Sequence, residues 1–246
     1  MVNAATKRIS SVVSRNIICV HVGDKYSSDY VEKLYRACIK HNREDFVFTI
    51  LHDNKSYDLN HSNVRLVEVE SMPFVSLHNR WWYKMQAFRK DVADCYQNLL
   101  LDLDIVIMNN MDKFWQYNPD NFVIIQDFNR HWFPNYKRSN SSVVKFTPDI
   151  ANKIYDSFIN DPINHVRKFR GDQDWFDEYV TDKVWWPKKW AMSWKWEVYS
   201  GGMVTCNSNQ YHSIKTLIDP ETSMLVFHGK PDPHEVPDDI IKLNWI

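Results

Sequence analysis

Two aspartates interrupt an otherwise apolar stretch of the chain. In LLLDLDIVI (99–107), Asp102 and Asp104 stand two residues apart, with three leucines before them and three branched residues after them. An unpaired carboxylate in such surroundings costs roughly several kcal/mol, so a compensating positive charge is expected nearby. Magnesium and manganese prefer carboxylate, water and phosphate oxygens. The pair therefore predicts a divalent-cation site that could clamp a diphosphate; the alternative is a strand-end pair that caps backbone amides.

The elements that must position these carboxylates can be read from the apolar periodicity. In the helix expected at 27–42, Tyr30, Leu34, Ala37 and Cys38 fall on one face. The first half is expected to hold strands at 16–22, 45–53, 64–70 and 99–101, and a second helix at 81–95. The second half is expected to hold strands at 122–127, 142–146, 201–205 and 224–228, and helices at 148–161 and 172–180.

The alternation of strands and helices indicates an α/β fold: a single Rossmann-like domain whose central mixed, mostly parallel sheet is flanked by helices. We expect residues 1–15 to be a flexible N-terminal segment and residues 16–246 to form this one domain. Ligands of such sheets bind beyond the carboxyl ends of the strands. The polar residues expected at those ends are Asp24, Asp53, Asp102, Asp104, Asp127 and His228.

Composition excludes several classes of function. A net charge of -1 argues against a general electrostatic grip on nucleic acid, and 5 glycines leave no glycine-rich phosphate loop. Four scattered cysteines without a C-x-x-C pair indicate a reducing, cytoplasmic location rather than a disulfide framework. No apolar run approaches the roughly 18 residues of a spanning helix, so no integral membrane segment is expected. The 11 tryptophans suit either sugar stacking or core packing.

The aspartate pair and its apolar flanks resemble the Asp-x-Asp element of glycosyltransferases of the GT-A fold, most closely the glycogenin-type group of family 8. The resemblance implies that Asp102 and Asp104 hold manganese, or magnesium, against the diphosphate of a nucleotide sugar. It also implies a nucleotide-binding half at about 16–110 and an acceptor-binding half at about 111–246.

Four further stretches resemble elements of that family in the same order. YKMQAFR (83–89) resembles the segment whose lysine, here Lys84, lies near the nucleotide and donor sugar. NSSVV (140–144) resembles the strand start beside the donor sugar, with Ser142 in place of a glycine. GDQDWF (171–176) resembles the segment over the reacting sugar, which implicates Asp172 and Gln173. FHGKPDP (227–233) resembles a compressed His-x-x-Gly-x-x-Lys-Pro element, which implies His228 as third metal ligand and Lys230 at the diphosphate.

The remaining site residues follow from their position along the chain. In GT-A folds the base and ribose lie just after the first strand, which would place Asp24 and Tyr26 there, with Tyr26 stacking on uracil and Asp53 accepting from the base. The candidates for a catalytic carboxylate are Asp127, Asp172 and Asp174. In the segment 185–196, Trp190 and Trp194 are expected to be exposed and to form an acceptor-sugar platform, whereas Lys195 could support the phosphate.

These observations predict a metal-dependent hexosyltransferase that moves a sugar from a nucleotide diphosphate donor to a saccharide or other hydroxyl acceptor. A UDP-sugar is the favoured donor. The resemblance favours retention of the anomeric configuration. An inverting GT-A transferase and a non-catalytic protein that binds carbohydrate or nucleotide sugar are the alternatives. A sugar-phosphate nucleotidyltransferase is a poorer match, because VHVGDKYSSDY (20–30) lacks its glycine-rich basic signature.

Overall fold

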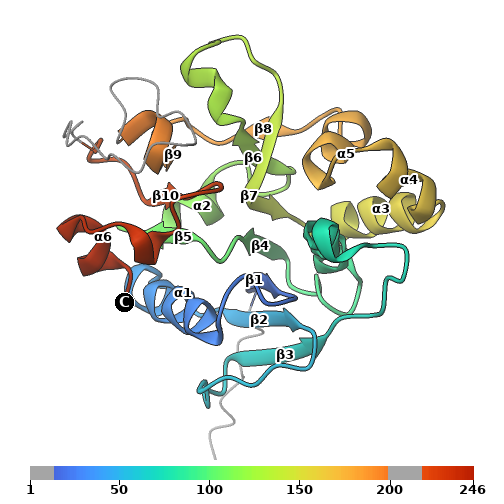
Figure 1. Cartoon of the computed structure of the whole chain (residues 1–246), viewed down its shortest axis with the longest axis horizontal. Coiled ribbons are helices and arrows are strands. Elements are labelled where there is room, and N and C mark those ends of the chain that lie inside the picture. Colours follow the sequence, from blue (N-terminus) through green and yellow to red (C-terminus); the bar gives the residue numbers. More distant parts are fainter. Residues whose placement is uncertain (1–13, 199–217) are drawn as a thin grey trace, which may run out of the picture.

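A computed structural model describes residues 14–198 and 218–246 of the chain. Its centre is a seven-stranded sheet in the order β3-β2-β1-β4-β7-β6-β8 (Figure 1). The parallel part comprises β1 (Arg15–His21), β2 (Val47–His52), β3 (Val64–Glu68) and β4 (Gln97–Leu101). In the rest of the sheet, β7 (Ser139–Phe146) runs antiparallel between β4 and β6 (Val123–Gln126), and the short β8 (Val184–Trp185) is parallel to β6. The expected mixed, mostly parallel α/β sheet is confirmed.

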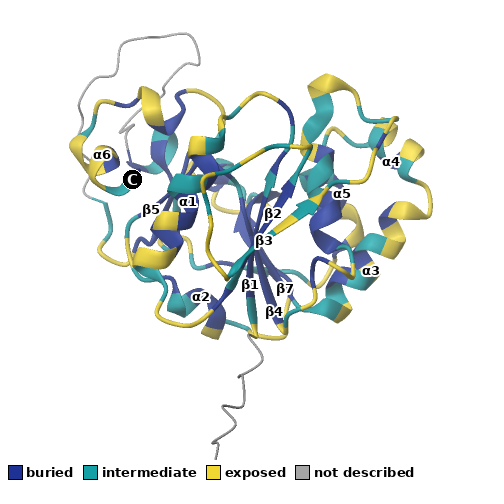
Figure 2. Cartoon of the chain, turned by 90° about the horizontal axis from the view of Figure 1, so that it is seen from below, coloured by how far each residue is buried: buried dark blue, intermediate teal, exposed yellow. Residues whose placement is uncertain are grey.

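Helices cover both faces of this sheet (Figure 2). Helix α1 (Ser28–His41) packs on one face through the apolar side predicted from its periodicity. The other face is covered by α3 (Pro148–Ile159), α5 (Asp172–Tyr179) and the 3₁₀ helix η1 (Leu77–Phe88). Alternate strand residues enter the two layers, so that Ile17 packs with α1 and its neighbour Ile18 packs with η1.

The stretch LLLDLDIVI contains two strands of two different sheets. The chain leaves β4 at Leu101, turns at residues 102–104, and enters β5 (Ile105–Ile107). Strand β5 belongs to a separate sheet of order β5-β10-β9, with β10 (Met224–Val226) antiparallel to β5 and parallel to β9 (Ala191–Ser193). The aspartates thus occupy the turn between the two sheets, while Leu103 between them is buried.

Several expected elements differ in extent. The helix expected at 81–95 is the 3₁₀ helix η1, which begins earlier, has non-helical backbone at Asn79 and ends at Phe88. The helix expected at 148–161 ends at Ile159 because Pro162 starts the separate helix α4 (Pro162–Lys168). The strand expected at 201–205 lies outside the described residues, as does most of the N-terminal segment. The remaining helices are α2 (Asp112–Gln116) and α6 (Asp239–Asn244), with short helical turns η2 (Phe128–His131), η3 (Trp194–Val198) and η4 (Pro233–Glu235).

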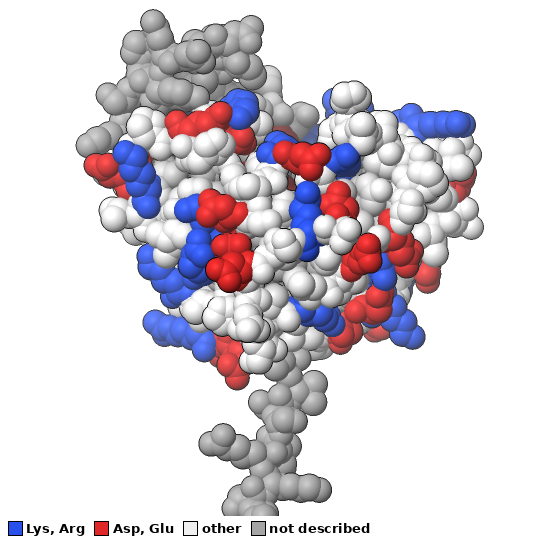
Figure 3. Space-filling model, turned by 60° about the horizontal axis from the view of Figure 1, so that its bottom comes forward, with Lys and Arg blue, Asp and Glu red and all other residues white. Residues whose placement is uncertain are grey.

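Most of the tryptophans are packed in the hydrophobic core. Six of the eleven are buried, including Trp82 on the core side of η1 and Trp194, which stacks on Phe227. On the face seen in Figure 3, Lys and Arg side chains lie interspersed with Asp and Glu. Within the described residues, no helix combines the length and apolar character needed to cross a bilayer.

Candidate active site

The carboxyl ends of β1 and β4 lie side by side, because these parallel strands pair in register from Arg15 with Gln97 to Cys19 with Leu101. The turn that carries the two aspartates therefore lies next to the loop that follows β1. Its position is fixed from the other side by β7, where the carbonyl of Ser142 accepts a hydrogen bond of 2.9 Å from the backbone N–H of Asp102. This is the edge at which ligands of α/β sheets bind.

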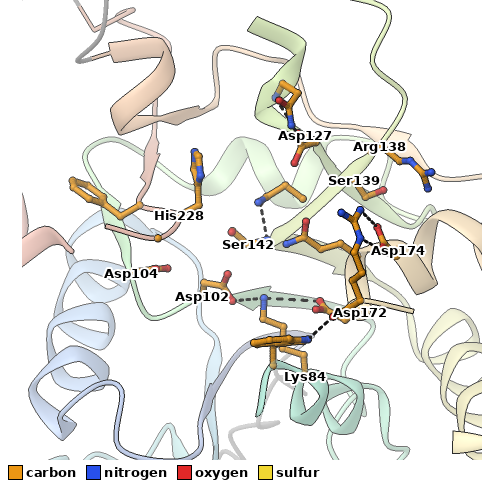
Figure 4. A pocket seen from close by; sticks show the side chains of 18 of the residues that line it. Lys84, Asp102, Asp104, Asp127, Arg138, Ser139, Ser142, Asp172, Asp174 and His228 are labelled. Atoms are coloured by element: carbon orange, nitrogen blue, oxygen red, sulfur yellow. Dashed lines mark hydrogen bonds and ion pairs between the residues drawn. The ribbon is translucent and has the colours of Figure 1, made fainter. Parts of the chain in front are cut away.

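Each of the two carboxylates has one close partner. The ammonium of Lys84, on η1, lies 2.6 Å from Oδ1 of Asp102, as Figure 4 shows. The hydroxyl of Tyr26, from the loop after β1, donates a hydrogen bond of 2.7 Å to Oδ2 of Asp104. Burial raises the pKa of Asp104, and the negative charge of Asp102 raises it further. A second positive charge at this turn would therefore stabilise the ionised pair.

Lys84 connects the aspartate turn to the helix α5. Its ammonium also lies 4.0 Å from Oδ2 of Asp172 and 3.1 Å from the hydroxyl of Ser141. Burial lowers the pKa of Lys84, but the charges of Asp102 and Asp172 outweigh that effect and leave the pKa above its ordinary value. Lys84 therefore carries its charge at neutral pH, although only 13% of its side chain is exposed.

Two cavities meet at this charged centre. One, of about 580 Å³, extends toward α5 and the β6–β7 connection, and the other, of about 550 Å³, extends along the loop after β1. The two cavities share five lining residues: Lys25, Trp81, Lys84, Asp102 and Asp104. We call the first the α5 cavity and the second the β1 cavity. An elongated ligand that lies in both must pass its middle over the two aspartates and Lys84.

The α5 cavity contains most of the residues expected at the reacting sugar. Asp172 lies in the first turn of α5 and is only 3% exposed, and its Oδ2 has no hydrogen-bond partner among the described residues. Burial raises the pKa of Asp172, and Lys84 opposes this rise. Gln173 and Ser142 also line the cavity. Asp127 lines it too, but its carboxylate caps η2 by accepting hydrogen bonds from the backbone and side chain of Asn129.

The β1 cavity contains two of the three residues expected at the nucleotide. Asp24 and Tyr26 line it, and the Asp24 side chain is almost fully exposed, with Lys55 at 3.5 Å. Asp53 is not among its lining residues. The Asp53 carboxylate instead accepts a hydrogen bond of 2.8 Å from the backbone N–H of Gly23, whose φ of +80° favours glycine. Asp53 thereby holds the turn that leads from β1 into the cavity.

The three expected metal ligands are not gathered in the structure. Within residues 14–198 and 218–246, no group of three His, Cys, Asp or Glu side chains has a metal-binding arrangement. His228 lines the α5 cavity, where its ring stacks on Phe128 and its Nε2 lies 2.7 Å from the hydroxyl of Ser193. Burial, with a smaller effect of Lys195, lowers the pKa of His228 to about 3, so the imidazole is neutral.

Three other expected positions differ from the sequence-based picture. Lys230 is not among the residues that line either cavity; its ammonium pairs with Asp232 at 2.6 Å and with Glu235 at 2.8 Å. Trp194 is 3% exposed and stacks on Phe227, so the expectation of an exposed ring there was wrong. Trp190 is only partly exposed and packs against the core. The amphipathic Lys/Trp pattern misled because these rings pack on elements distant in the sequence.

Two further expected residues have partners that explain their positions. The carboxylate of Asp174 forms a paired contact with Arg170, at 2.7 Å from its Nε, and lines the rim of the α5 cavity. The ammonium of Lys195 donates to the carbonyl of Lys230 at 3.4 Å.

Several cavity residues were not identified from the sequence. Lys25 and Trp81 line both cavities, while Tyr136, Arg138, Asn140 and Arg170 line the α5 cavity. Lys25 directly follows Asp24, and Asn140 begins the NSSVV stretch, so adjacency to predicted residues was an available signal for those two. Trp81 belongs to the Trp81-Trp82 pair, whose residue type suits sugar stacking as well as core packing. Tyr136, Arg138 and Arg170 carry no pattern that distinguishes them from surface residues.

No protein-family model and no curated protein sequence matches the chain. Among solved structures, an active-site mutant of LgtC is similar with a TM-score of 0.67 and 13% identity over 89% of each chain. LgtC described as a galactosyltransferase in complex with donor and acceptor sugar analogues gives a TM-score of 0.64 at 13% identity, covering 89% of this chain and 88% of that one. The glycosyltransferase GlyE from Streptococcus pneumoniae gives 0.66 at 10% identity, covering 94% of this chain and 60% of that one. The structural neighbours are thus glycosyltransferases, and the chain has their GT-A fold.

Proposed function

We propose that this protein is a glycosyltransferase of the glycogenin-type group of family 8 that transfers a sugar from a UDP-sugar to a hydroxyl acceptor. The observation that carries the proposal is the meeting of two cavities at Asp102, Asp104 and Lys84. A nucleotide sugar has the matching order of parts: an uncharged nucleoside, a charged diphosphate and an uncharged sugar. The β1 cavity then takes the nucleoside, the α5 cavity takes the sugar, and the charged centre takes the diphosphate.

The two aspartates are suitable ligands for a divalent cation, manganese or magnesium. They supply hard oxygen ligands, and the burial of Asp104 beside Asp102 disfavours the ionised pair unless a further positive charge is near. Bound there, the cation would neutralise the diphosphate and make it a better leaving group. His228, neutral and at the edge of the same cavity, is our candidate for a third ligand, which requires its Nε2 to leave the hydroxyl of Ser193.

Lys84 supports departure of the nucleotide. Its charge is held within the protein, so it is in place before the reaction and costs no reorganisation when negative charge develops on the leaving phosphate. Lys25, at the same junction of the cavities, adds a second ammonium. Lys230 would reach the diphosphate only by leaving Asp232 and Glu235, so we assign it a smaller part.

Asp172 and Gln173 orient the transferred sugar. Oδ2 of Asp172 accepts no hydrogen bond from the described residues, although the Lys84 ammonium lies 4.0 Å away, so it is available as an acceptor for a sugar hydroxyl. The charge of Asp172 would stabilise the positive charge that develops on the sugar ring. Asp127 is a weaker candidate for the catalytic carboxylate because Asn129 already occupies it. We propose retention, in which an oxygen of the departing phosphate takes the proton of the acceptor hydroxyl. An inverting reaction would instead need a carboxylate such as Asp172 as the base.

Manganese-dependent release of UDP from UDP-sugars tests the proposal, measured first without acceptor and then with simple sugars. We expect release by the wild-type protein, loss of release with EDTA, and a drop of about 100-fold or more in Asp104→Ala. Asp239→Ala is the matched control, because that carboxylate is 93% exposed, lies on α6 and lines neither cavity. The proton NMR spectrum of the product reports whether the anomeric configuration is retained.

The release assay, together with calorimetry, distinguishes the enzyme from a protein that only binds nucleotide sugars. The contacts of His228 with Ser193 and of Lys230 with Asp232 favour this non-catalytic alternative, because they keep both side chains away from a metal or diphosphate. A protein that only binds nucleotide sugars would take up UDP-sugar with manganese in calorimetry and release no UDP. If no nucleotide sugar is bound or consumed, and Asp104→Ala changes neither, both functions are wrong.

A further inference from the structure

The 3₁₀ helix η1 has two rows of residues at a spacing of three. In a 3₁₀ helix, residues i and i+3 eclipse each other, so each row points in one direction. The row Trp82, Met85 and Phe88 is fully buried in the core. In the row that precedes it, Trp81 and Lys84 line both cavities, while His78 lines only the β1 cavity and Ala87 is buried. Adjacent tryptophans therefore have different roles, one in the core and one at the proposed substrate site.

The indole of Trp81 is fixed at its edge and open on its surface. Its Nε1 donates a hydrogen bond of 3.2 Å to the carbonyl of Arg170, yet 44% of the residue is exposed. A Cβ added at Gly171 would lie 2.9 Å from that Nε1 and 3.2 Å from Cδ1. The absence of a side chain at Gly171 thus lets the ring lie against the segment that leads into α5.

The groups around Trp81 indicate what it contacts. Lys84 lies one helical turn away, with Asp102 at 2.6 Å, and Asp172 follows Gly171 directly. One 3₁₀ turn rises about 6 Å, which is comparable to the size of a sugar ring. A sugar attached to a phosphate at Lys84 would therefore lie within reach of the indole. A pyranose has an apolar face of C–H groups that packs on aromatic rings and a rim of hydroxyls for which carboxylates and amides are partners.

We propose that Trp81 is the stacking platform for the donor sugar and that Gly171 positions its ring. This inference rests on the proposed function, and it assigns to Trp81 one of the two roles, sugar stacking rather than core packing, that the tryptophans of the sequence left open. It predicts a separation between two ligands: Trp81 contributes to binding of the nucleotide sugar and contributes little to binding of the nucleotide alone.

Calorimetry with manganese present measures this separation, using UDP, UDP-glucose and UDP-galactose as the probes. We expect Trp81→Ala to raise the dissociation constant of the tighter-binding UDP-sugar by about tenfold. The dissociation constant of UDP should change by less than about twofold. Trp81→Phe keeps an aromatic face and should recover most of the affinity. Trp132→Ala is the matched control, because Trp132 is 43% exposed and lines neither cavity.

Gly171→Ala tests the positioning part without removing the ring. The backbone at Gly171 is extended, with φ of -175°, so alanine adds no backbone strain there. The new methyl group must displace the indole, and we expect UDP-sugar affinity to fall by about threefold with UDP unchanged. Combined with Trp81→Ala, the same substitution should have no further effect, because no ring is left to displace.

Each outcome has a separate meaning. If Trp81→Ala leaves the affinity for UDP-sugar unchanged, or lowers the affinity for UDP as much as that for UDP-sugar, the inference that Trp81 stacks on the sugar is wrong, while the proposed function stands. If the wild-type protein binds none of the three probes, the proposed function is wrong and the inference falls with it. Thermal midpoints of the variants, measured by circular dichroism, show whether a loss of affinity reflects a loss of folding.

Discussion

Burial should decide how much an ion pair contributes in this protein, and two lysines allow a direct comparison. Lys84 lies 2.6 Å from Asp102 and 4.0 Å from Asp172, and Lys230 lies 2.6 Å from Asp232 and 2.8 Å from Glu235. Each ammonium thus faces two carboxylates, one of them at 2.6 Å in both cases, and the second carboxylate lies nearer to Lys230 than to Lys84. The difference is exposure: 13% of the Lys84 side chain is accessible and 66% of the Lys230 side chain.

Lys84→Met should lower the free energy of unfolding, because it leaves the carboxylates of Asp102 and Asp172 without their positive partner. Removing one partner of a buried pair leaves an uncompensated charge and costs about 3–5 kcal/mol in free energy of unfolding. The exposed pairs of Lys230 are screened by water, so Lys230→Met should cost about 0–1 kcal/mol. Both substitutions keep a side chain of similar length, so packing loss is matched. Adding Asp102→Asn to Lys84→Met should recover part of the loss.

The pH dependence provides a second test of the same reasoning. Burial raises the pKa of Asp172, and Lys84 opposes that rise, so the Lys84→Met protein should have a still higher pKa at this carboxyl. A carboxyl whose pKa is higher in the folded than in the unfolded state binds more protons when folded, which favours the folded state as pH falls. The stability difference between wild type and Lys84→Met should therefore narrow from pH 8 to pH 5.

Urea unfolding followed by tryptophan fluorescence, with EDTA present throughout, measures these differences. The reasoning is refuted if Lys84→Met costs no more than Lys230→Met, or if its cost is the same at pH 5 and pH 8. An unchanged slope of free energy against urea would show that the native and unfolded states of each variant remain comparable.

Three further predictions concern the scaffold. Burial lowers the pKa of Lys145 to about 8 from 10.5, so the unfolded state binds more protons than the folded state between these pH values. In urea unfolding, the free energy of unfolding of the wild type relative to that of Lys145→Met should therefore rise by about 3 kcal/mol from pH 8 to pH 10.5. A difference that does not change with pH would contradict the lowered pKa. Arg130→Met should cost about 3–5 kcal/mol in the same measurement, because it leaves the carboxylate of Glu197 buried without its 3.0 Å partner; a cost below about 1 kcal/mol would mean that water replaces the guanidinium. Gly23→Ala should lower the thermal midpoint and weaken UDP binding, since φ is +80° and the new methyl group overlaps the Arg80 side chain, and an unchanged midpoint would show that this turn relaxes freely.

The sequence by itself was sufficient for the class of fold and for locating the charged turn at Asp102 and Asp104. Periodicity is a local property, so the apolar face of α1 and the buried strands could be recognised from their own residues. The carboxylates of Asp102 and Asp104 could be recognised because charge within an apolar run needs a compensating partner. The strand-end rule did not reach Asp172 and Lys84, which lie on helices, and only motif resemblance placed them near the two aspartates.

Tertiary structure decided what those local patterns leave open. Nothing within LLLDLDIVI shows that its two halves belong to different sheets, because β7 and β10, which separate them, come from residues far along the chain. Trp81 and Trp82 are the same residue type in adjacent positions, and only the packing of η1 against the core makes one of them accessible. Lys84 and Lys230 are likewise the same residue type, and only the fold buries the first side chain and leaves the second exposed. Burial and the partners of a side chain depend on distant segments, and therefore only the folded chain determines which groups meet in the two cavities.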